Sequence, residues 1–231
     1  MRAGLGRAAV RDLAKRHGIR PSRSLGQHFL LDPNLARAIA ADAGAAPGVR
    51  IVEVGAGLGS LTVALAATGA EVLAIEFDRA LLPALLEVTA PFGEVEVMAA
   101  DVTRLDWEAT LGDGGWTMCA NLPYNIATPL VLRVLDAAPR VGRMVVMVQR
   151  EVGERLVAKP GEDGYGPVSL RVEYHAFAAR IRRVPRDVFW PRPTVESVVV
   201  GSSDPPGVAM AEHRYSTRVL SCQGKRRPPV R

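Results

Sequence analysis

The sequence has few cysteines and no long apolar segment. Its 231 residues include only two cysteines, Cys119 and Cys222, which lie far apart and at no metal-ligand spacing. This pattern indicates neither a disulfide framework nor a metal site, and it is typical of a reducing compartment. No run of eighteen or more uncharged apolar residues occurs, and the N-terminus lacks the apolar core of a secretory signal. We therefore expect a cytoplasmic protein without a membrane span or a metal.

Positive charge exceeds negative charge, and it is unevenly distributed. The net charge is +5, and 48% of the residues are hydrophobic, as in a globular chain with one substantial domain and a small one. Residues 1–23 contain seven Lys or Arg and one acidic residue, and a second basic concentration spans residues 140–186. Such regions are either a solvated surface or a face that binds phosphates, and charge alone leaves both interpretations open.

From residue 50 onward, apolar runs alternate with helical patterns. The predicted strands are 50–57, 71–78, 95–101, 116–121 and 143–149, and the predicted helices are 58–68, 79–90, 129–137 and 150–157. Two further apolar stretches, 169–179 and 195–200, would complete a sheet of seven strands. Strands that alternate with helices predict an α/β fold with a mainly parallel sheet and right-handed crossovers.

The chain divides into three predicted parts. Residues 1–49 are basic and predict one or two helices with a loop at 22–29, which would complete a pocket at the edge of the sheet. Residues 50–203 form the α/β domain. Residues 204–231 are basic and rich in proline, and no helical or strand period survives after about residue 218. We expect this tail to be poorly ordered.

Candidate ligand-binding residues follow three successive predicted strands. The stretch Gly55-Ala-Gly57-Leu-Gly59 follows the first strand, Glu76 closes the second and Asp101 closes the third. Glycines let a ligand approach the backbone, Glu76 suits ribose hydroxyls, and Asp101 suits an adenine amine. The spacing is not the G-x-G-x-x-G of dinucleotide sites, so we expect an adenosine-containing cofactor without a pyrophosphate, and S-adenosyl-L-methionine fits best. Taken singly, each feature is also explained as a turn or a solvated strand end.

The fourth strand ends in Asn121-Leu-Pro-Tyr124, at the same predicted edge of the sheet. The Asn121 side-chain oxygen and the Leu122 carbonyl would accept the two N–H groups of an aromatic amine and aim its lone pair at a methyl group. Tyr124 offers a flat face to a base, and Phe189, before Pro-Arg-Pro, would close the other side of this slot. Only an unstacked or single-stranded base could enter. The alternatives are a turn with a capping Asn and a proline-rich loop.

Together these motifs resemble the ribosomal RNA adenine N6,N6-dimethyltransferase family. The matching segments are S-L-G-Q-H-F-L-L-D (24–32), V-E-V-G-A-G-L-G-S-L-T (52–62), A-I-E-F-D (74–78), A-A-D-V (99–102), N-L-P-Y-N-I-A-T-P (121–129) and F-W-P-R-P-T-V-E-S (189–197). The resemblance implies a Rossmann-like S-adenosylmethionine-dependent methyltransferase fold. It also implies dimethylation of two adjacent adenines in a hairpin loop near the 3′ end of small-subunit rRNA during ribosome assembly. We expect the protein to be a monomer.

The resemblance also assigns roles to individual residues. The cofactor contacts of the family would fall on the following positions: His28, Leu30, Gly55, Glu76, Asp101 and Asn121. Asn121, Leu122, Tyr124 and Phe189 would form the catalytic site, with the base between the last two.

The chain departs from the family pattern at two places. The family usually has Asn where this chain has His28, whose imidazole would donate to the methionine part of the cofactor. The family also carries a small C-terminal helical domain, whereas this chain loses every helical signal after Tyr215. We therefore expect a missing or truncated C-terminal domain.

Three alternatives remain open on the sequence. One is an adenine methyltransferase that acts on large-subunit rRNA and confers antibiotic resistance, although its reactive loop tends to read Asn-Ile-Pro-Tyr. The second is a ribosome-assembly factor that binds rRNA without catalysis. A DNA adenine methyltransferase, which usually has two prolines in this loop, is a weaker third.

Overall fold

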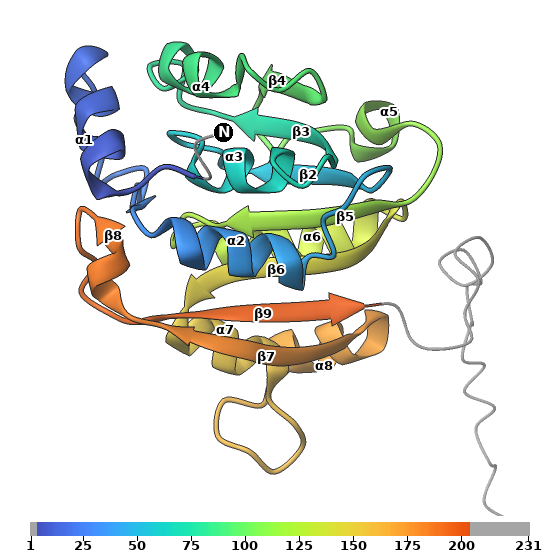
Figure 1. Cartoon of the computed structure of the whole chain (residues 1–231). Helices are drawn as coiled ribbons and strands as arrows, with labels where there is room; N and C mark the ends of the chain where they lie inside the picture. Colours follow the sequence, from blue (N-terminus) through green and yellow to red (C-terminus); the bar gives the residue numbers. More distant parts are fainter. Residues whose placement is uncertain (1–3, 204–231) are drawn as a thin grey trace, which may run out of the picture.

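The computed structural model describes residues 4–203, and the predicted tail at 204–231 lies outside them (Figure 1). In chain order the elements are α1 (Arg7–Arg16), β1 (Phe29–Leu30), α2 (Pro33–Asp42), β2 (Arg50–Val54), α3 (Ser60–Ala66), β3 (Glu71–Glu76), α4 (Leu82–Thr89), β4 (Val95–Ala99), α5 (Trp107–Leu111), β5 (Trp116–Asn121), α6 (Ala127–Ala137), β6 (Val141–Gln149), α7 (Arg150–Val157), α8 (Pro167–His175), β7 (Phe177–Val184), the 3-10 turn η1 (Arg186–Val188), β8 (Phe189–Trp190) and β9 (Ser197–Ser203). None of the described helices is both long and apolar enough to cross a membrane.

Seven strands form one mainly parallel sheet, which confirms the predicted α/β class. Their order is β4-β3-β2-β5-β6-β9-β7, and β1 and β8 form a separate two-stranded sheet. The strands from β4 to β6 are parallel, whereas β9 runs antiparallel to both β6 and β7. Because β2 pairs with β3 on one side and β5 on the other, the strand order reverses there. Open α/β sheets bind ligands outside the carboxyl ends of the strands at such a point.

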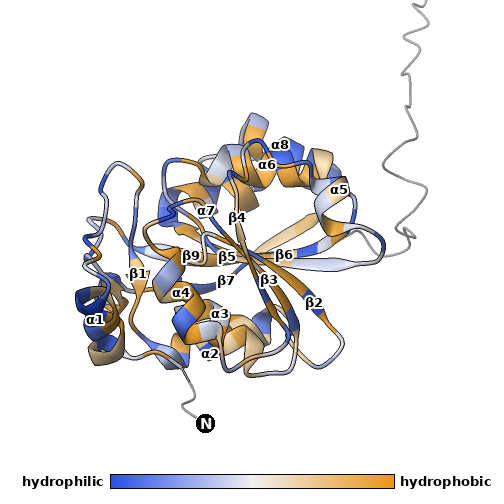
Figure 2. Ribbon diagram, turned by 90° about the horizontal axis from the view of Figure 1, so that it is seen from above, coloured by the Kyte–Doolittle hydropathy of each residue, from blue (hydrophilic) through white to orange (hydrophobic). Residues whose placement is uncertain are grey.

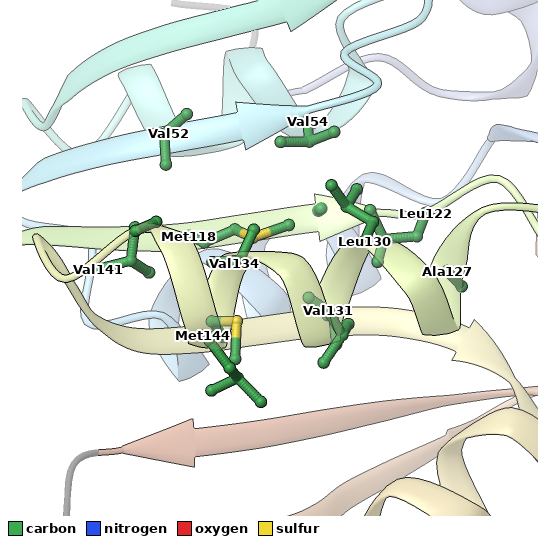
Figure 3. Packing of buried hydrophobic residues seen from close by; sticks show 14 of the residues in the cluster. Val52, Val54, Met118, Leu122, Ala127, Leu130, Val131, Val134, Val141 and Met144 are labelled. Atoms are coloured by element: carbon green, nitrogen blue, oxygen red, sulfur yellow. The ribbon is translucent and has the colours of Figure 1, made fainter. Parts of the chain in front are cut away.

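Two apolar clusters cover the two faces of the sheet. One face packs against α5, α6, α7 and α8, and the other packs against α2, α3 and α4 (Figure 2). Alternate residues of one strand serve opposite clusters: Met118 faces α6, and its neighbour Cys119 faces α2 and α3. Figure 3 shows Val131 and Val134 of α6 over Met118 and the strands beside it. Burial on both faces explains why β5 and β6 read as continuous apolar runs in the sequence.

The predicted strand at 169–179 is wrong over its first part, because these residues belong to helix α8. Leu170, Val172 and Tyr174 alternate in sequence as they would in a half-buried strand. The helix leaves Leu170 and Tyr174 exposed and buries Val172 together with Ser169, three residues earlier. Strand β7, which lies at the edge of the sheet, begins only after this helix. The short elements α5, β1 and β8 were not predicted, since they are too short to show a period.

The N-terminal segment of the described residues packs beside the edge of the sheet where the parallel strands have their carboxyl ends. Helix α1 buries Val10 and Leu13 in a third apolar cluster with Phe29 of β1. Strand β1 pairs with β8, and the Ser60 hydroxyl at the start of α3 donates to the Leu30 carbonyl at 2.7 Å. These contacts hold residues 25–30 beside the carboxyl ends of the parallel strands. The three-part division of the chain stays a prediction.

Candidate active site

A cavity of about 330 Å³ lies at the carboxyl ends of β2, β3 and β5 and beside the residues that follow β4. Nearly all of the predicted site residues line it, and they are His28, Leu30, Gly55, Glu76, Asp101, Asn121, Leu122 and Tyr124. Phe189 is the exception. The topology therefore brings together residues that are far apart in the sequence, such as His28 and Tyr124, which are separated by 96 positions. In residues 4–203 no group of three His, Cys, Asp or Glu side chains is arranged to hold a metal.

The glycine turn after β2 forms one wall of the cavity. Gly55 and Gly57 have left-handed backbones, with φ of 72° and 59°, which glycine adopts without strain. A Cβ on Gly55 would lie 3.7 Å from the Asn121 carbonyl oxygen, and one on Gly57 would lie 3.3 Å from the Phe29 ring. The Gly57 N–H donates to the Glu76 carboxylate at 2.8 Å. The turn thus joins the ends of three strands closely.

Glu76 ends β3 as a buried and oriented carboxylate. It is 6% exposed, and its two oxygens accept the backbone N–H groups of Gly57 and Asp78, each at 2.8 Å. Burial raises its pKa, and these hydrogen bonds oppose the rise. Each carboxylate oxygen keeps a second lone pair for a ligand hydroxyl. Asp78 in turn accepts from Gln27 at 2.7 Å, which ties the N-terminal loop to β3.

Asp101 lies two residues beyond the end of β4, not within it. Its Oδ1 accepts from the Thr103 backbone N–H at 2.9 Å and from the Thr103 hydroxyl at 2.7 Å. These bonds lower the pKa of Asp101, so the group is an anion and only accepts hydrogen bonds. Its Oδ2 lies 3.7 Å from the Arg104 guanidinium. An ionised acceptor at the cavity wall suits the exocyclic amine of an adenine.

Asn121 is the last residue of β5, and the nitrogen of its side-chain amide already forms a hydrogen bond. Its Nδ2 donates to the His28 backbone carbonyl at 3.0 Å, and this contact fixes which end of the amide is the oxygen. Oδ1 is therefore left as an acceptor. Leu122 is 1% exposed, and its N–H donates to the Met147 carbonyl at 3.0 Å. Its side chain belongs to the core, so only its backbone can serve a ligand.

Tyr124 and His28 form a ring pair at the same end of the cavity. Their centroids are 5.0 Å apart and their planes are tilted by 32°. The Tyr124 hydroxyl lies 3.0 Å from the Ser197 Oγ at the start of β9. Burial raises the pKa of Tyr124, so the phenol stays neutral at physiological pH. The Tyr124 side chain is thus positioned by His28 at its ring and by Ser197 at its hydroxyl.

The His28 ring has a defined tautomer. Its Nδ1 lies 2.7 Å from the Pro191 carbonyl, and a carbonyl only accepts, so Nδ1 carries the hydrogen. In the neutral ring Nε2 is therefore an acceptor. This changes the expectation that the imidazole donates to the cofactor: the neutral form suits an ammonium group, and only the protonated form donates from Nε2.

Phe189 is not at the cavity, contrary to the prediction that it closes the base slot. It lies in β8 opposite Leu30 of β1, is 3% exposed, and packs with Val184 and Val199 in a core cluster. Pairing of β8 with β1 turns this side chain inward. In this conformation Tyr124 and His28 are the aromatic residues at the base end.

Glu53 is a cavity residue that sequence reasoning missed. It lies in β2, is 1% exposed, and its Oε2 has no hydrogen-bond partner among residues 4–203. Burial raises its pKa to about 8, the Thr62 side chain opposes this rise, and the charge of Glu76 adds to it. The signal was present in the sequence, since an acid inside the apolar run I-V-E-V is unusual on a buried strand face.

The sequence matches a family model described as ribosomal RNA adenine dimethylase over residues 19–206. Two curated relatives are named ribosomal RNA small subunit methyltransferase A. The one from Pelotomaculum thermopropionicum is 44% identical over 203 residues, which are 84% of this chain and 69% of the relative. The one from Moorella thermoacetica is 42% identical over 197 residues, covering 81% of this chain and 68% of the relative.

Solved structures show the same architecture. A dimethyladenosine transferase from Plasmodium falciparum superposes with a TM-score of 0.69 at 26% identity, covering 77% of this chain and 64% of that protein. The 23S rRNA methyltransferase ErmE has the same TM-score at 24% identity, covering 77% of this chain and 70% of its own. The second likeness shows the fold alone.

Proposed function

The chain belongs to the ribosomal RNA adenine dimethylase family, and we propose that it methylates the N6 atoms of two adjacent adenines in small-subunit (16S) rRNA with S-adenosyl-L-methionine. The adenines would be those of the 3′-terminal hairpin loop, modified during ribosome assembly, as the family resemblance implies. One observation carries the proposal: the Asn121 amide is held by the His28 carbonyl with its oxygen left as an acceptor, in the same cavity as Glu76 and Asp101.

The residues of the cavity fit this cofactor. S-adenosyl-L-methionine supplies, when bound, a methyl group on a positively charged sulfur. Glu76 would accept hydrogen bonds from its ribose hydroxyls and Asp101 from its adenine amine. The unpartnered Oε2 of Glu53 and the lone pair of His28 Nε2 suit its positively charged end. Oε2 of Glu53 has no hydrogen-bond partner among residues 4–203, and an ammonium group of the ligand would supply one.

The opposite end of the cavity fits an extruded adenine. Asn121 Oδ1 and the Leu122 carbonyl would accept the two N–H groups of N6, which draws the nitrogen lone pair out of conjugation with the ring. As the nitrogen gains the methyl group and a positive charge, these oxygens face that charge until a proton leaves. The protein therefore acts by orientation and electrostatics, and no strong base is required. Tyr124 would support the base by stacking.

The comparisons do not favour the alternatives. The relatives at 44% and 42% identity are named for the small subunit, which does not favour the large-subunit alternative. A factor without catalysis would not need the arrangement of acceptors described above.

Methyl transfer to isolated ribosomal subunits tests the proposal. The protein is incubated with S-adenosylmethionine labelled in the methyl group and with small subunits that lack the two dimethyladenosines. We expect label only in the two adjacent adenines, with large subunits and fully methylated small subunits as matched negative controls. Tight binding to small subunits without any incorporation would instead support the assembly factor.

A further inference from the structure

Two exposed arginines lie on the loops that flank Tyr124. Arg23 is in the turn at 22–27, and Arg192 is in the segment 191–196 between β8 and β9. Neither residue belongs to the cavity wall, and neither has a role in the reaction described above. Their positions relative to Tyr124 follow from the contacts of their neighbours.

The turn that carries Arg23 packs directly on the reactive loop. The Arg23 carbonyl accepts the Gly26 N–H at 3.1 Å, which closes the turn. A Cβ on Gly26 would lie 3.3 Å from the Tyr124 backbone nitrogen and 3.3 Å from the Asn125 side-chain oxygen. Arg23 is therefore on a tight turn that rests against Tyr124.

The segment that carries Arg192 is fastened to Tyr124 from the other side. The Pro191 carbonyl, next to Arg192, accepts from His28, whose ring lies 5.0 Å from that of Tyr124. At the end of the segment, Ser197 meets the Tyr124 hydroxyl at 3.0 Å. Both ends of the segment thus contact the base-binding residues.

Neither arginine forms an ion pair with an acidic residue among residues 4–203. The nearest acid along the chain from Arg192 is Glu196, and it faces Arg150 at 3.9 Å. Some other exposed arginines do pair with acids, as Arg155 does with Glu151 and Arg16 with Glu87. Arg23 and Arg192, on the two loops that contact the base-binding residues, are therefore available to an external anion.

We propose that Arg23 and Arg192 bind the RNA phosphates on the two sides of the flipped adenine nucleotide. The inference rests on the proposed function, because a base drawn into the cavity leaves its sugar–phosphate chain at the mouth, one phosphate on each side. A guanidinium matches phosphate with two parallel hydrogen bonds. The clamp would hold the nucleotide in place without reading its sequence.

Salt dependence of substrate binding tests the clamp. In the double variant Arg23→Ala/Arg192→Ala we expect the KM for small subunits to rise at least tenfold at physiological salt. We also expect the slope of log KM against log salt concentration to fall by about 1.4, or about 0.7 for each lost phosphate contact to single-stranded RNA. The kcat at saturating subunits and the Kd of S-adenosylmethionine should not change. Arg23→Lys/Arg192→Lys should restore the slope, and the KM only in part, because lysine keeps the charge without the bidentate geometry.

A charge-matched double variant separates the clamp from general attraction. Arg143, near the start of β6, and Arg180, midway along β7, are exposed, form no ion pair with an acid among residues 4–203 and lie away from the cavity edge. Arg143→Ala/Arg180→Ala removes the same charge and should leave the slope within about 0.3 of wild type. An equal loss in both double variants, or a wild-type slope in the Arg23/Arg192 variant with an unchanged melting temperature, overturns the clamp. Absence of methyl transfer by the wild-type protein would count against the proposed function instead, and direct RNA binding by the same variants would still decide the clamp.

Discussion

The two ends of the cavity differ in the charge of the side chains that they present. The end formed by β2, β3 and the residues after β4 presents three carboxyl groups, those of Glu53, Glu76 and Asp101. The end formed by β5 and the loops beside it presents an amide and a phenol, those of Asn121 and Tyr124. The first end suits the hydroxyl, amine and ammonium donors of the cofactor, because carboxyl oxygens accept hydrogen bonds, and the second suits an uncharged base.

Both ends orient their acceptors by the same means. Backbone groups hold the side chains: Gly57 and Asp78 hold Glu76, and the His28 carbonyl holds Asn121. In each case the strand end positions the residue, and a loop from elsewhere in the chain fixes its rotation. Preorganisation of this kind lets an acceptor act without rearranging during the reaction. The two ends therefore differ in chemistry but not in construction, and this comparison can be tested residue by residue.

The largest effect is expected at the neutral end, from Asn121→Ala. Loss of the Oδ1 acceptor should lower kcat by about 10²- to 10³-fold, the cost of removing one preorganised polar group from an active site. Single-turnover methyl transfer measures this directly. Asn125→Ala is the matched control, because this exposed amide lines the same cavity without a held orientation, and it should retain most of the activity. Full activity of the Asn121 variant would remove this residue from the mechanism.

At the charged end, Glu76→Gln should weaken the cofactor and not the chemistry. A hydrogen bond to a charged group contributes about 1.5–3 kcal/mol, so we expect the Kd of S-adenosylmethionine to rise about 10- to 100-fold. Isothermal titration provides the Kd, and kcat at saturating cofactor should change much less. Glu71→Gln, at the exposed start of the same strand, is the control. Equal effects of both substitutions would mean that Glu76 acts only through net charge.

Tyr124→Ala should raise the KM for small subunits and leave the cofactor Kd unchanged. Base stacking contributes about 1–3 kcal/mol, which corresponds to roughly a 5- to 100-fold change in KM. Tyr124→Phe keeps the ring and loses only the contact to Ser197, so its effect should be a few-fold at most. Tyr174→Ala, on a side chain that is 78% exposed on α8, is the matched control. A large loss of cofactor affinity in Tyr124→Ala would contradict the division of the cavity into two ends.

The sequence predicted the strand ends that carry the site residues better than it predicted which residues of the loops and the edge strand face the cavity. Strand ends carrying Gly55, Glu76 and Asn121 were predicted because buried parallel strands give long apolar runs with abrupt polar ends. The burial of Phe189 was missed, because the pairing of β8 with β1 joins residues about 160 positions apart and leaves no local signal. The exposed edge strand β7 was placed wrongly for a related reason, since an edge strand rich in arginine lacks the alternation of a half-buried one.

The smallest expected effect is the pH dependence of cofactor affinity that Glu53 causes. This effect tests the end of the cavity that carries the carboxyl groups. The Glu53 pKa of about 8 in the cofactor-free protein means that binding a cation must first remove a proton at neutral pH. Cofactor affinity should therefore increase as the pH rises from 7 towards 9, by at most tenfold per pH unit, and level off above the pKa. Cys119, the neighbouring thiol on β5, has a raised pKa and stays neutral across this range, so it adds no charge of its own.

The stability of the cofactor-free protein should change in the opposite direction. Between the pKa of the unfolded chain and about 8, the folded protein holds a proton on Glu53 that the unfolded chain has lost. The free energy of unfolding should then decrease as the pH rises through this window, by up to about 1.4 kcal/mol per pH unit from this group. Glu53→Gln removes both dependences while keeping the shape of the side chain. A variant with the same rise in cofactor affinity as the wild type would show that the pH dependence does not arise from Glu53.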